Sequence, residues 1–141
     1  MFRLSRNFEY ALIALKHLSS QGGKKVSTVK EISSCYEISF TLMARILFIL
    51  KKAGVLTSVR GTKGGYTLGK GLSKLSVYDL MKVVGEPPYL SKCLDKSGEK
   101  SKCSVPTAGC NIFPAIKELQ REVYNLTKGI KLKEIMAEGD N

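Results

Sequence analysis

The residues best suited to chemistry are three cysteines that lie close together, Cys93, Cys103 and Cys110, spaced C-x9-C-x6-C. Thiolates bind soft metal ions and iron–sulfur clusters, and such sites usually have about four ligands. A fourth ligand must therefore come from elsewhere, and no histidine is near because the only one is His17. The spacing lacks the closely spaced cysteine pairs of zinc sites. On spacing alone, a metal or cluster site and free, redox-reactive thiols are equally good interpretations.

The cysteines do not suit a catalytic role. A cysteine nucleophile needs a base to activate it, and the sequence places neither a histidine nor an evident pair of acids beside these residues. We therefore expect that the protein is not an enzyme. Cys35 stands apart, three residues after Ile32 in a predicted short helix, and we expect it on the inner face as a small buried side chain rather than a ligand.

The three cysteines occupy a segment without helical or strand periodicity, residues 89–111, which is rich in Lys, Ser and Gly. Connections between helices are usually about 2–8 residues long, so something should organise a segment of this length. The next predicted helix, residues 112–127, has Pro114 in its first turn and an apolar stripe formed by Ile116, Leu119, Val123 and Leu126. A small head offers this stripe little surface, so we expect it to pack against the same helix of a second copy.

A basic hairpin is predicted over residues 55–70. Two β-prone runs, Leu56–Val59 and Tyr66–Leu68, flank the turn Arg60-Gly61-Thr62-Lys63-Gly64-Gly65. Its glycines allow the positive φ values that a hairpin tip requires. Arg60 and Lys63 make the tip basic. A small basic hairpin directly after a helical segment is typical of the wing of a DNA-binding winged helix.

The residues before the hairpin predict a helix-turn-helix. After a first helix over residues 4–19, Thr28 and Glu31 have the spacing of a capping box that starts a short second helix. A turn at residues 36–39 leads to a third helix, Phe40–Lys52, with Ser39 as its N-cap and Gly54 as its stop. We expect Phe40–Lys52 to be the recognition helix. Its predicted inner face is formed by Leu42, Ile46, Ile49, Leu50 and Ala53.

The distribution of charge indicates a polyanionic partner. The net charge is +11, and the span between Glu37 and Asp79 contains no acid but seven bases: Arg45, Lys51, Lys52, Arg60, Lys63, Lys70 and Lys74. A basic span that also carries a helix-turn-helix pattern is the electrostatic signature of a nucleic-acid-binding protein. A purely structural nucleoid protein would also be basic, but would need neither the helix-turn-helix nor the cysteine segment.

The patterns together predict a mainly α protein. It has a winged helix-turn-helix head with a small two-stranded β wing, plus a long C-terminal dimerisation helix. We expect three parts: a DNA-binding domain over residues 1–86, a cysteine-containing cluster loop over 87–111, and the dimerisation helix and tail over 112–141. Within the first part, a helix over residues 72–84 is capped by Ser76. No apolar run reaches the length of about 18 residues that a membrane span needs, and the N-terminus lacks a signal-peptide pattern, so we expect no membrane association and a cytoplasmic protein.

The sequence resembles the Rrf-type bacterial winged-helix regulators, which include the iron–sulfur cluster regulator IscR and the nitric-oxide sensor NsrR. The resemblance rests on Lys51-Lys52-Ala53-Gly54-Val55-Leu56, Ser58-Val59-Arg60-Gly61 and Gly64-Gly65-Tyr66, together with Leu75-Ser76-Val77-Tyr78-Asp79 and the cysteine triplet before a long helix. It covers nearly the whole chain. It implies a homodimer that binds a palindromic operator in double-stranded DNA, usually as a repressor.

The resemblance also implies an iron–sulfur cluster, of the 2Fe–2S or 4Fe–4S type, that switches DNA affinity in response to iron, nitric oxide or redox state. Its ligands would be Cys93, Cys103 and Cys110. The IscR-like fourth ligand is a histidine three residues after the last cysteine, but Phe113 stands there. The NsrR-like ligand is an acid near the N-terminus, which matches Glu9 and would come from the partner subunit. The alternative is a cluster-free regulator that responds through cysteine thiols or a small metabolite.

For DNA contacts, the resemblance assigns Ser39 and Thr41 to the backbone or base edges and Arg60 to the minor groove, where a narrow groove attracts arginine. A Glu-Gln pair that some members use to read bases is replaced by Ala44-Arg45. Arginine pairs bidentately with guanine, so we expect Arg45 to read a different operator. Phosphate contacts are expected from Lys51, Lys52, Lys63 and Lys70.

Overall fold

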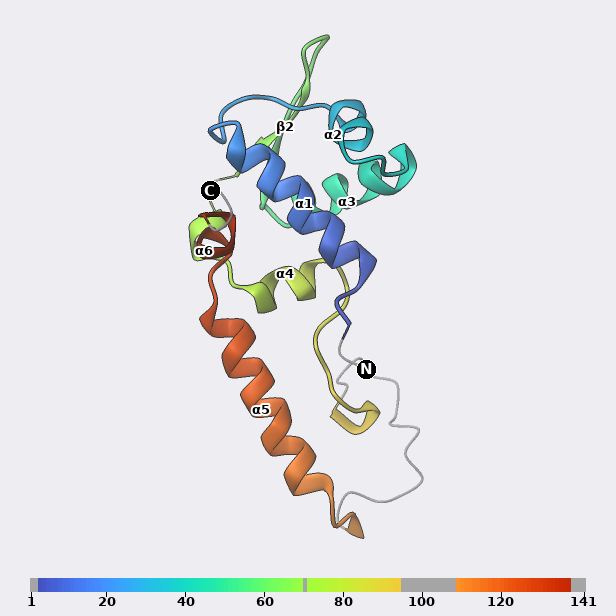
Figure 1. The fold of residues 1–141 in the computed structure, drawn as a ribbon, viewed down its shortest axis with the longest axis vertical. Coiled ribbons are helices and arrows are strands. Elements are labelled where there is room, and N and C mark those ends of the chain that lie inside the picture. Colours follow the sequence, from blue (N-terminus) through green and yellow to red (C-terminus); the bar gives the residue numbers. More distant parts are fainter. Residues whose placement is uncertain (1–2, 70, 95–108, 138–141) are drawn as a thin grey trace.

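The chain folds into a helical head with a short β-hairpin, and one long helix projects from the head (Figure 1). The computed structural model describes residues 3–69, 71–94 and 109–137. In these ranges the elements are α1 (Arg6–Ser20), α2 (Val29–Cys35), α3 (Phe40–Lys52), β1 (Leu56–Val59), β2 (Gly65–Leu68), η1 (Leu72–Lys74), α4 (Val77–Val83), η2 (Lys92–Leu94), α5 (Phe113–Gly129) and α6 (Leu132–Ala137). This is the predicted mainly α fold with a two-stranded antiparallel wing.

Polar caps start the helices of the head where the sequence predicts them. Thr28 and Glu31 form the predicted capping box of α2, with the Thr28 hydroxyl 3.1 Å from the Glu31 amide nitrogen. The Ser39 hydroxyl accepts a hydrogen bond from the amide of Leu42 at the start of α3. Because these side chains satisfy amides that have no partner inside the helix, they fix where each helix begins.

The core of the head is built mainly from α1, α3 and α4, and α6 adds two further buried residues. Leu15 of α1, Leu47 of α3 and Leu132 of α6 all have 0% exposure, and Met136 of α6 has 4%. Each fully buried side chain of this size stabilises the fold by about 1.5–3 kcal/mol. The short segment after the long helix therefore completes the core of the head.

The predicted inner face of α3 was partly wrong. Its buried residues are Met43, Ile46, Leu47 and Leu50. Ala53 is exposed because it is the C-cap, where the backbone already turns toward Gly54. Leu42 and Ile49 are only half-buried.

The turn between α2 and α3 shows why the prediction of a buried Cys35 was wrong. Cys35 is exposed. It is the last residue of α2, and the chain turns away from the core directly after it. Glu37 has φ of +53°, and the amide of Ile38 donates to the carbonyl of Ser33 at 2.9 Å. This closed helix end leaves Ile32 and Ser33 as the buried residues of α2.

The wing is joined to the helix-turn-helix at its base. Gly54 has φ of +80°, and the Val55 amide donates to the Leu50 carbonyl at 2.9 Å, so α3 ends in a closed turn that directs the chain into β1. β1 and β2 pair as predicted, with Leu56 opposite Leu68. Ser27 and Tyr66 exchange two backbone hydrogen bonds, of 3.0 and 2.8 Å. The wing is thereby held to the segment that precedes α2.

The helix predicted over residues 72–84 is divided into η1 and α4, and Ser76 caps α4 as predicted. The backbone at Leu75 and Val77 bonds to the segment after α5 instead, because Leu132 donates to Leu75 and Val77 donates to Ile130. α4 therefore begins only at Val77, with Ser76 and Asp79 in a capping box.

Asp79 also links α4 to α5. The Lys128 Nζ atom lies 2.6 Å from its Oδ1 atom. Partial burial alone would raise the pKa of Asp79, but the hydrogen bonds from Lys128 and from the amide and hydroxyl of Ser76 outweigh it and lower the pKa from 3.8 to about 2. The same contact raises the pKa of Lys128.

We expect Asp79 to make stability depend on pH. A carboxyl whose pKa is lower in the folded than in the unfolded state stabilises the fold above the unfolded value, and this stabilisation is lost as the pH falls from about 4 to about 2. Asp79→Asn should lower the free energy of unfolding at pH 7. It should also reduce the slope of the free energy of unfolding against pH in this range, by up to the value that corresponds to the binding of about one proton. Urea unfolding at several pH values measures both effects. The control Glu122→Gln, at an exposed acid of α5, should behave like wild type, and an equal slope for Asp79→Asn would contradict the assignment.

Candidate DNA-reading surface and cysteine site

The exposed face of α3 carries polar and basic side chains. Thr41, Arg45, Phe48 and Lys52 are all exposed and recur at helical spacing. The opposite face contains Met43, Leu47 and Leu50, which are buried in the core. Ser39 is exposed at the N-cap, and its hydroxyl hydrogen remains free to donate to a DNA oxygen while its oxygen accepts from Leu42.

Phe48 is a candidate that the sequence-based assignment missed. Its side chain is 56% exposed although it lies between Arg45 and Lys52 on the polar face of α3. The signal was in the sequence, because Phe48 is seven residues after Thr41 and therefore lies on the same face of a helix.

The tip of the wing presents Arg60 and Lys63, and both are exposed. The glycines beside them are required by close packing of the backbone. A Cβ atom on Gly64 would lie 2.4 Å from the carbonyl oxygen of Val59, and one on Gly65 would lie 2.4 Å from that of Ser27. Any other residue at these two positions would clash with the backbone. Lys51 and Lys52 are exposed at the end of α3, whereas Lys70 lies outside the described residues. We call the exposed face of α3 and the tip of the wing the DNA-reading surface.

Two of the three loop cysteines lie within the described residues. Cys93 is in η2 and Cys110 lies just before α5; both are half-buried free thiols. The Cys93 Sγ atom is 3.1 Å from the Ser91 Oγ atom. Cys103 lies outside the described residues.

The chain before Cys93 is held against α5 by one side chain. The amide of Leu90 donates to the Oε1 atom of Gln120 at 2.8 Å, and the Nε2 atom of Gln120 donates to the carbonyl of Pro88 at 2.9 Å. Both bonds are partly buried. Gln120 therefore fixes the segment that leads to Cys93 alongside α5, the helix that follows Cys110.

Glu9 is exposed in the first turn of α1. Among residues 3–69, 71–94 and 109–137, no three His, Cys, Asp or Glu side chains gather as a metal site. Glu9 therefore does not join Cys93 and Cys110 within one protomer. This is consistent with Figure 1, where α1 lies in the head while the start of α5 is at the far end of the molecule.

α5 exposes an apolar stripe. Leu119 is 59% exposed and Leu126 is 65% exposed. Both line an apolar groove of about 830 Å³ between α5 and the segment 88–91, whose other walls include Leu4 and Met81. Within the described residues, no helix is both long and apolar enough to cross a bilayer.

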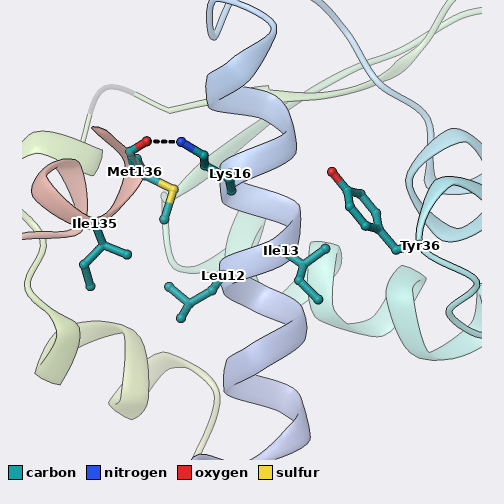
Figure 2. Close-up of a pocket in the computed structure, with 6 residues that line it drawn as sticks. All are labelled: Leu12, Ile13, Lys16, Tyr36, Ile135 and Met136. Carbon is teal, nitrogen blue, oxygen red and sulfur yellow. Dashed lines mark hydrogen bonds between the residues drawn. The ribbon is translucent and has the colours of Figure 1, made fainter. Parts of the chain in front are cut away.

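A second, smaller pocket of about 270 Å³ lies between α1, α6 and the helix-turn-helix turn (Figure 2). Its lining is mostly apolar, with Leu12 and Ile13 from α1 and Ile135 from α6. Lys16 donates to the carbonyl of Met136 at one side, and Tyr36 closes the other side. The pocket thus touches both the C-terminal helix and the turn before the recognition helix.

Known proteins share both the sequence pattern and the fold of this chain. Residues 4–138 match the Rrf2 family, which is described as iron-dependent transcriptional regulators. The chain belongs to the Rrf2 family. It is therefore a DNA-binding transcriptional regulator of winged-helix type. Members of this family are regulators and not enzymes. The predicted resemblance is confirmed.

Three similar proteins illustrate the Rrf2 fold. NsrR of Halalkalibacterium halodurans, an HTH-type transcriptional regulator, is 22% identical over 138 residues, covering 98% of this chain and 92% of that protein. CymR, the global cysteine regulator of B. subtilis, has a TM-score of 0.75 at 21% identity and covers 99% of this chain and 100% of its own. IscR of T. potens has a TM-score of 0.69 at 19% identity, and the match covers 99% of this chain and 89% of that protein.

The exposed wing arginine yields a prediction about salt dependence. Arg60→Ala should weaken operator binding. It should also flatten the slope of log affinity against log salt concentration by about one unit for each head on the DNA, because binding then releases fewer counterions from the phosphates. Fluorescence anisotropy over a salt series measures the slope. Lys117→Ala removes an exposed charge on α5, far from the wing (Figure 1), and should leave the slope unchanged. An unaltered slope in Arg60→Ala would mean that the wing does not contact DNA.

Proposed function

We propose that this Rrf2 protein is a transcriptional repressor that binds a palindromic operator as a homodimer, under the control of an iron–sulfur cluster. The observation that carries the proposal is the separation of two surfaces. The acid-free surface of α3 and the wing lies at one end of the protomer, and the start of α5, which follows Cys110, lies at the other (Figure 1). In this arrangement residues 1–86 bind DNA, 87–111 hold the cluster and 112–141 dimerise.

The proposed DNA contacts follow from the exposed side chains. α3 enters the major groove, where Arg45 can pair with guanine while Ser39 and Thr41 contact the backbone or base edges. Arg60 enters the neighbouring minor groove. Phosphate contacts come from Lys51, Lys52, Lys63 and Lys70. All of these except Lys70 lie in the described residues, and each is exposed.

Dimerisation is supported by the apolar stripe of α5. Leu119 and Leu126 are more than half exposed, and the groove beside them is lined mainly by apolar side chains. An exposed stripe of this kind is costly in water and is relieved by pairing with a second copy. A twofold axis through paired α5 helices would present two heads to successive major grooves of a palindrome.

The donor set fits an iron–sulfur cluster. Cys93 and Cys110 are free, half-buried thiols at the two ends of the loop, and Ser91 can donate to the Cys93 sulfur. Thiolates are the ordinary ligands of such clusters, and hydrogen bonds to sulfur tune them. Cys103 would be the third ligand, and Glu9 of the partner subunit would be the fourth. When bound, the cluster, of the 2Fe–2S or 4Fe–4S type, would supply a redox-active group that exists in more than one state.

The contacts around α5 provide a route from the cysteine site to the head. Gln120 holds the chain before Cys93 on α5, and Lys128 holds the other end of α5 on Asp79 of α4. A change at the cysteine segment can therefore shift α5, and with it the relative pose of the two heads. Regulation would then be a population shift between a pose that fits two half-sites and one that does not.

The second candidate function is a cluster-free regulator that responds through its thiols or a small metabolite. The pocket in Figure 2 favours it, because an apolar hollow with Lys16 at its edge suits a small apolar carboxylate. Its wall includes Tyr36, which ends α2 directly before the turn to α3. CymR, named as a regulator of cysteine, has the same fold.

The stripe of α5 predicts the effect of a charge. Leu126→Glu should weaken self-association at least about tenfold, because an unpaired carboxylate would be buried in an apolar interface. Binding to a palindromic operator should weaken with it. Sedimentation equilibrium measures the first effect. Asn125→Glu adds the same charge at the neighbouring exposed position, off the stripe, and should still dimerise. A Leu126→Glu protein that remains dimeric would place the interface elsewhere.

The proposed ligands predict spectroscopic behaviour. Anaerobically reconstituted wild type should show the visible absorption of an iron–sulfur cluster with matching iron and sulfide contents. Replacement of Cys93, Cys103 or Cys110 by alanine should each abolish or greatly reduce it, because each removes a thiolate ligand. Glu9→Ala should give a labile cluster that loses iron faster to a chelator.

The matched control is Cys35→Ala, which removes an exposed thiol outside the loop and should leave the spectrum unchanged. A colourless, iron-free wild type after reconstitution would exclude the cluster and leave the cluster-free regulator. A full cluster in all three loop variants would show that the ligands are wrong.

A further inference from the structure

Phe48 is an exposed aromatic side chain that neither folding nor dimerisation accounts for. It is 56% exposed, and it belongs neither to the buried core nor to the apolar residues packed on it. Its neighbour Leu47 is completely buried, so α3 has a well-defined inner face that excludes Phe48. The exposed stripe lies on α5, which extends away from the helix-turn-helix (Figure 1).

The position of Phe48 on α3 is that of a base-reading residue. Counted from Thr41, the residues Ala44, Arg45 and Phe48 have the spacing i+3, i+4 and i+7, which puts them on one face. Homeodomain recognition helices contact bases with side chains at this spacing. Lys52, the next exposed residue on that face, is basic. Phe48 therefore lies within the surface that faces the polyanion.

We infer that Phe48 is a specificity-determining residue that recognises thymine through the C5-methyl group in the major groove. The inference rests on the proposed docking of α3 in that groove. Phenylalanine has no hydrogen-bond donor or acceptor, so it cannot recognise a phosphate or a polar base edge. The one apolar group that B-DNA presents in the major groove is the thymine methyl, and phenylalanine is among the side chains that contact it. Arg45 and Phe48 would then recognise guanine and thymine on neighbouring steps.

The consequence is a half-site with one thymine whose methyl group matters. Replacing thymine by uracil removes only that methyl and leaves all hydrogen-bonding groups intact. The expected loss is about fourfold in affinity for each contacted methyl, the factor for withdrawing one methyl-sized apolar group from contact.

The experiment begins with the full-length protein and a random DNA duplex pool, from which it selects its operator. Each thymine of the half-site is then replaced by uracil, and binding is measured for wild type and Phe48→Ala. Wild type should lose about fourfold affinity at one position per half-site. Phe48→Ala should bind the thymine and uracil duplexes equally. Phe48→Leu, which keeps an apolar contact, should retain part of the discrimination.

Phe40→Ala is the matched control. Phe40 is 57% exposed, but it lies about 80° around the helix from Phe48 and should keep the sensitivity to uracil. Circular dichroism checks that each variant is folded. The inference is overturned if wild type binds every uracil duplex as tightly as the thymine duplex, or if Phe48→Ala still binds the thymine duplex more tightly than the uracil duplex. In either case, successful selection of an operator shows that the protein binds specific DNA. A wild type that selects no sequence would overturn the proposed operator binding as well.

Discussion

The carboxylate of Asp79 joins the two functional ends of the protein. It completes the cap of α4 with Ser76, and it pairs with Lys128 near the end of α5. Tyr78 and Tyr124 pack edge to face beside this pair, with ring centroids 4.8 Å apart. The direction in which α5 leaves the head depends on these contacts, and so does the place of the cysteine segment that Gln120 holds on α5. The Asp79–Lys128 pair is thus one of the contacts that connect α5 to the head within one protomer.

Much of the fold could be predicted because its signals are local. Caps such as Thr28 and Ser39 act on amides three residues away, and Gly54 is where α3 needs a positive φ. The errors arose where distant contacts decide. Leu75 and Ser76 interrupt the helix predicted over residues 72–84, because the backbone of Leu75 and Val77 bonds to residues 130–132. Cys35 follows Ile32 at helical spacing, but the helix ends at Cys35 before the core can cover it.

The residues of the candidate site also divide into those that local sequence signals predict and those that only the fold brings together. Arg60 and Lys63 could be assigned from sequence because a basic, glycine-rich tip needs only nearby residues. Phe48 was missed because an apolar residue in a helix is usually assigned to the core, although its spacing from Thr41 already placed it on the polar face, where the structure leaves it 56% exposed. The contact between Gln120 and the segment 88–90 spans some thirty residues and is made to backbone atoms. No pattern of residue types predicts a contact of that kind.

The position of α6 has a consequence for the order in which the molecule can be assembled. Leu132 and Met136 fill the core of the head against α1, yet the chain reaches them only after the cysteine loop and α5. A chain emerging from the ribosome folds from its N-terminus. The head of the nascent protein therefore stays incomplete until the cysteine segment and α5 have been synthesised. During synthesis, this topology therefore prevents the head from folding completely before the rest of the chain is present.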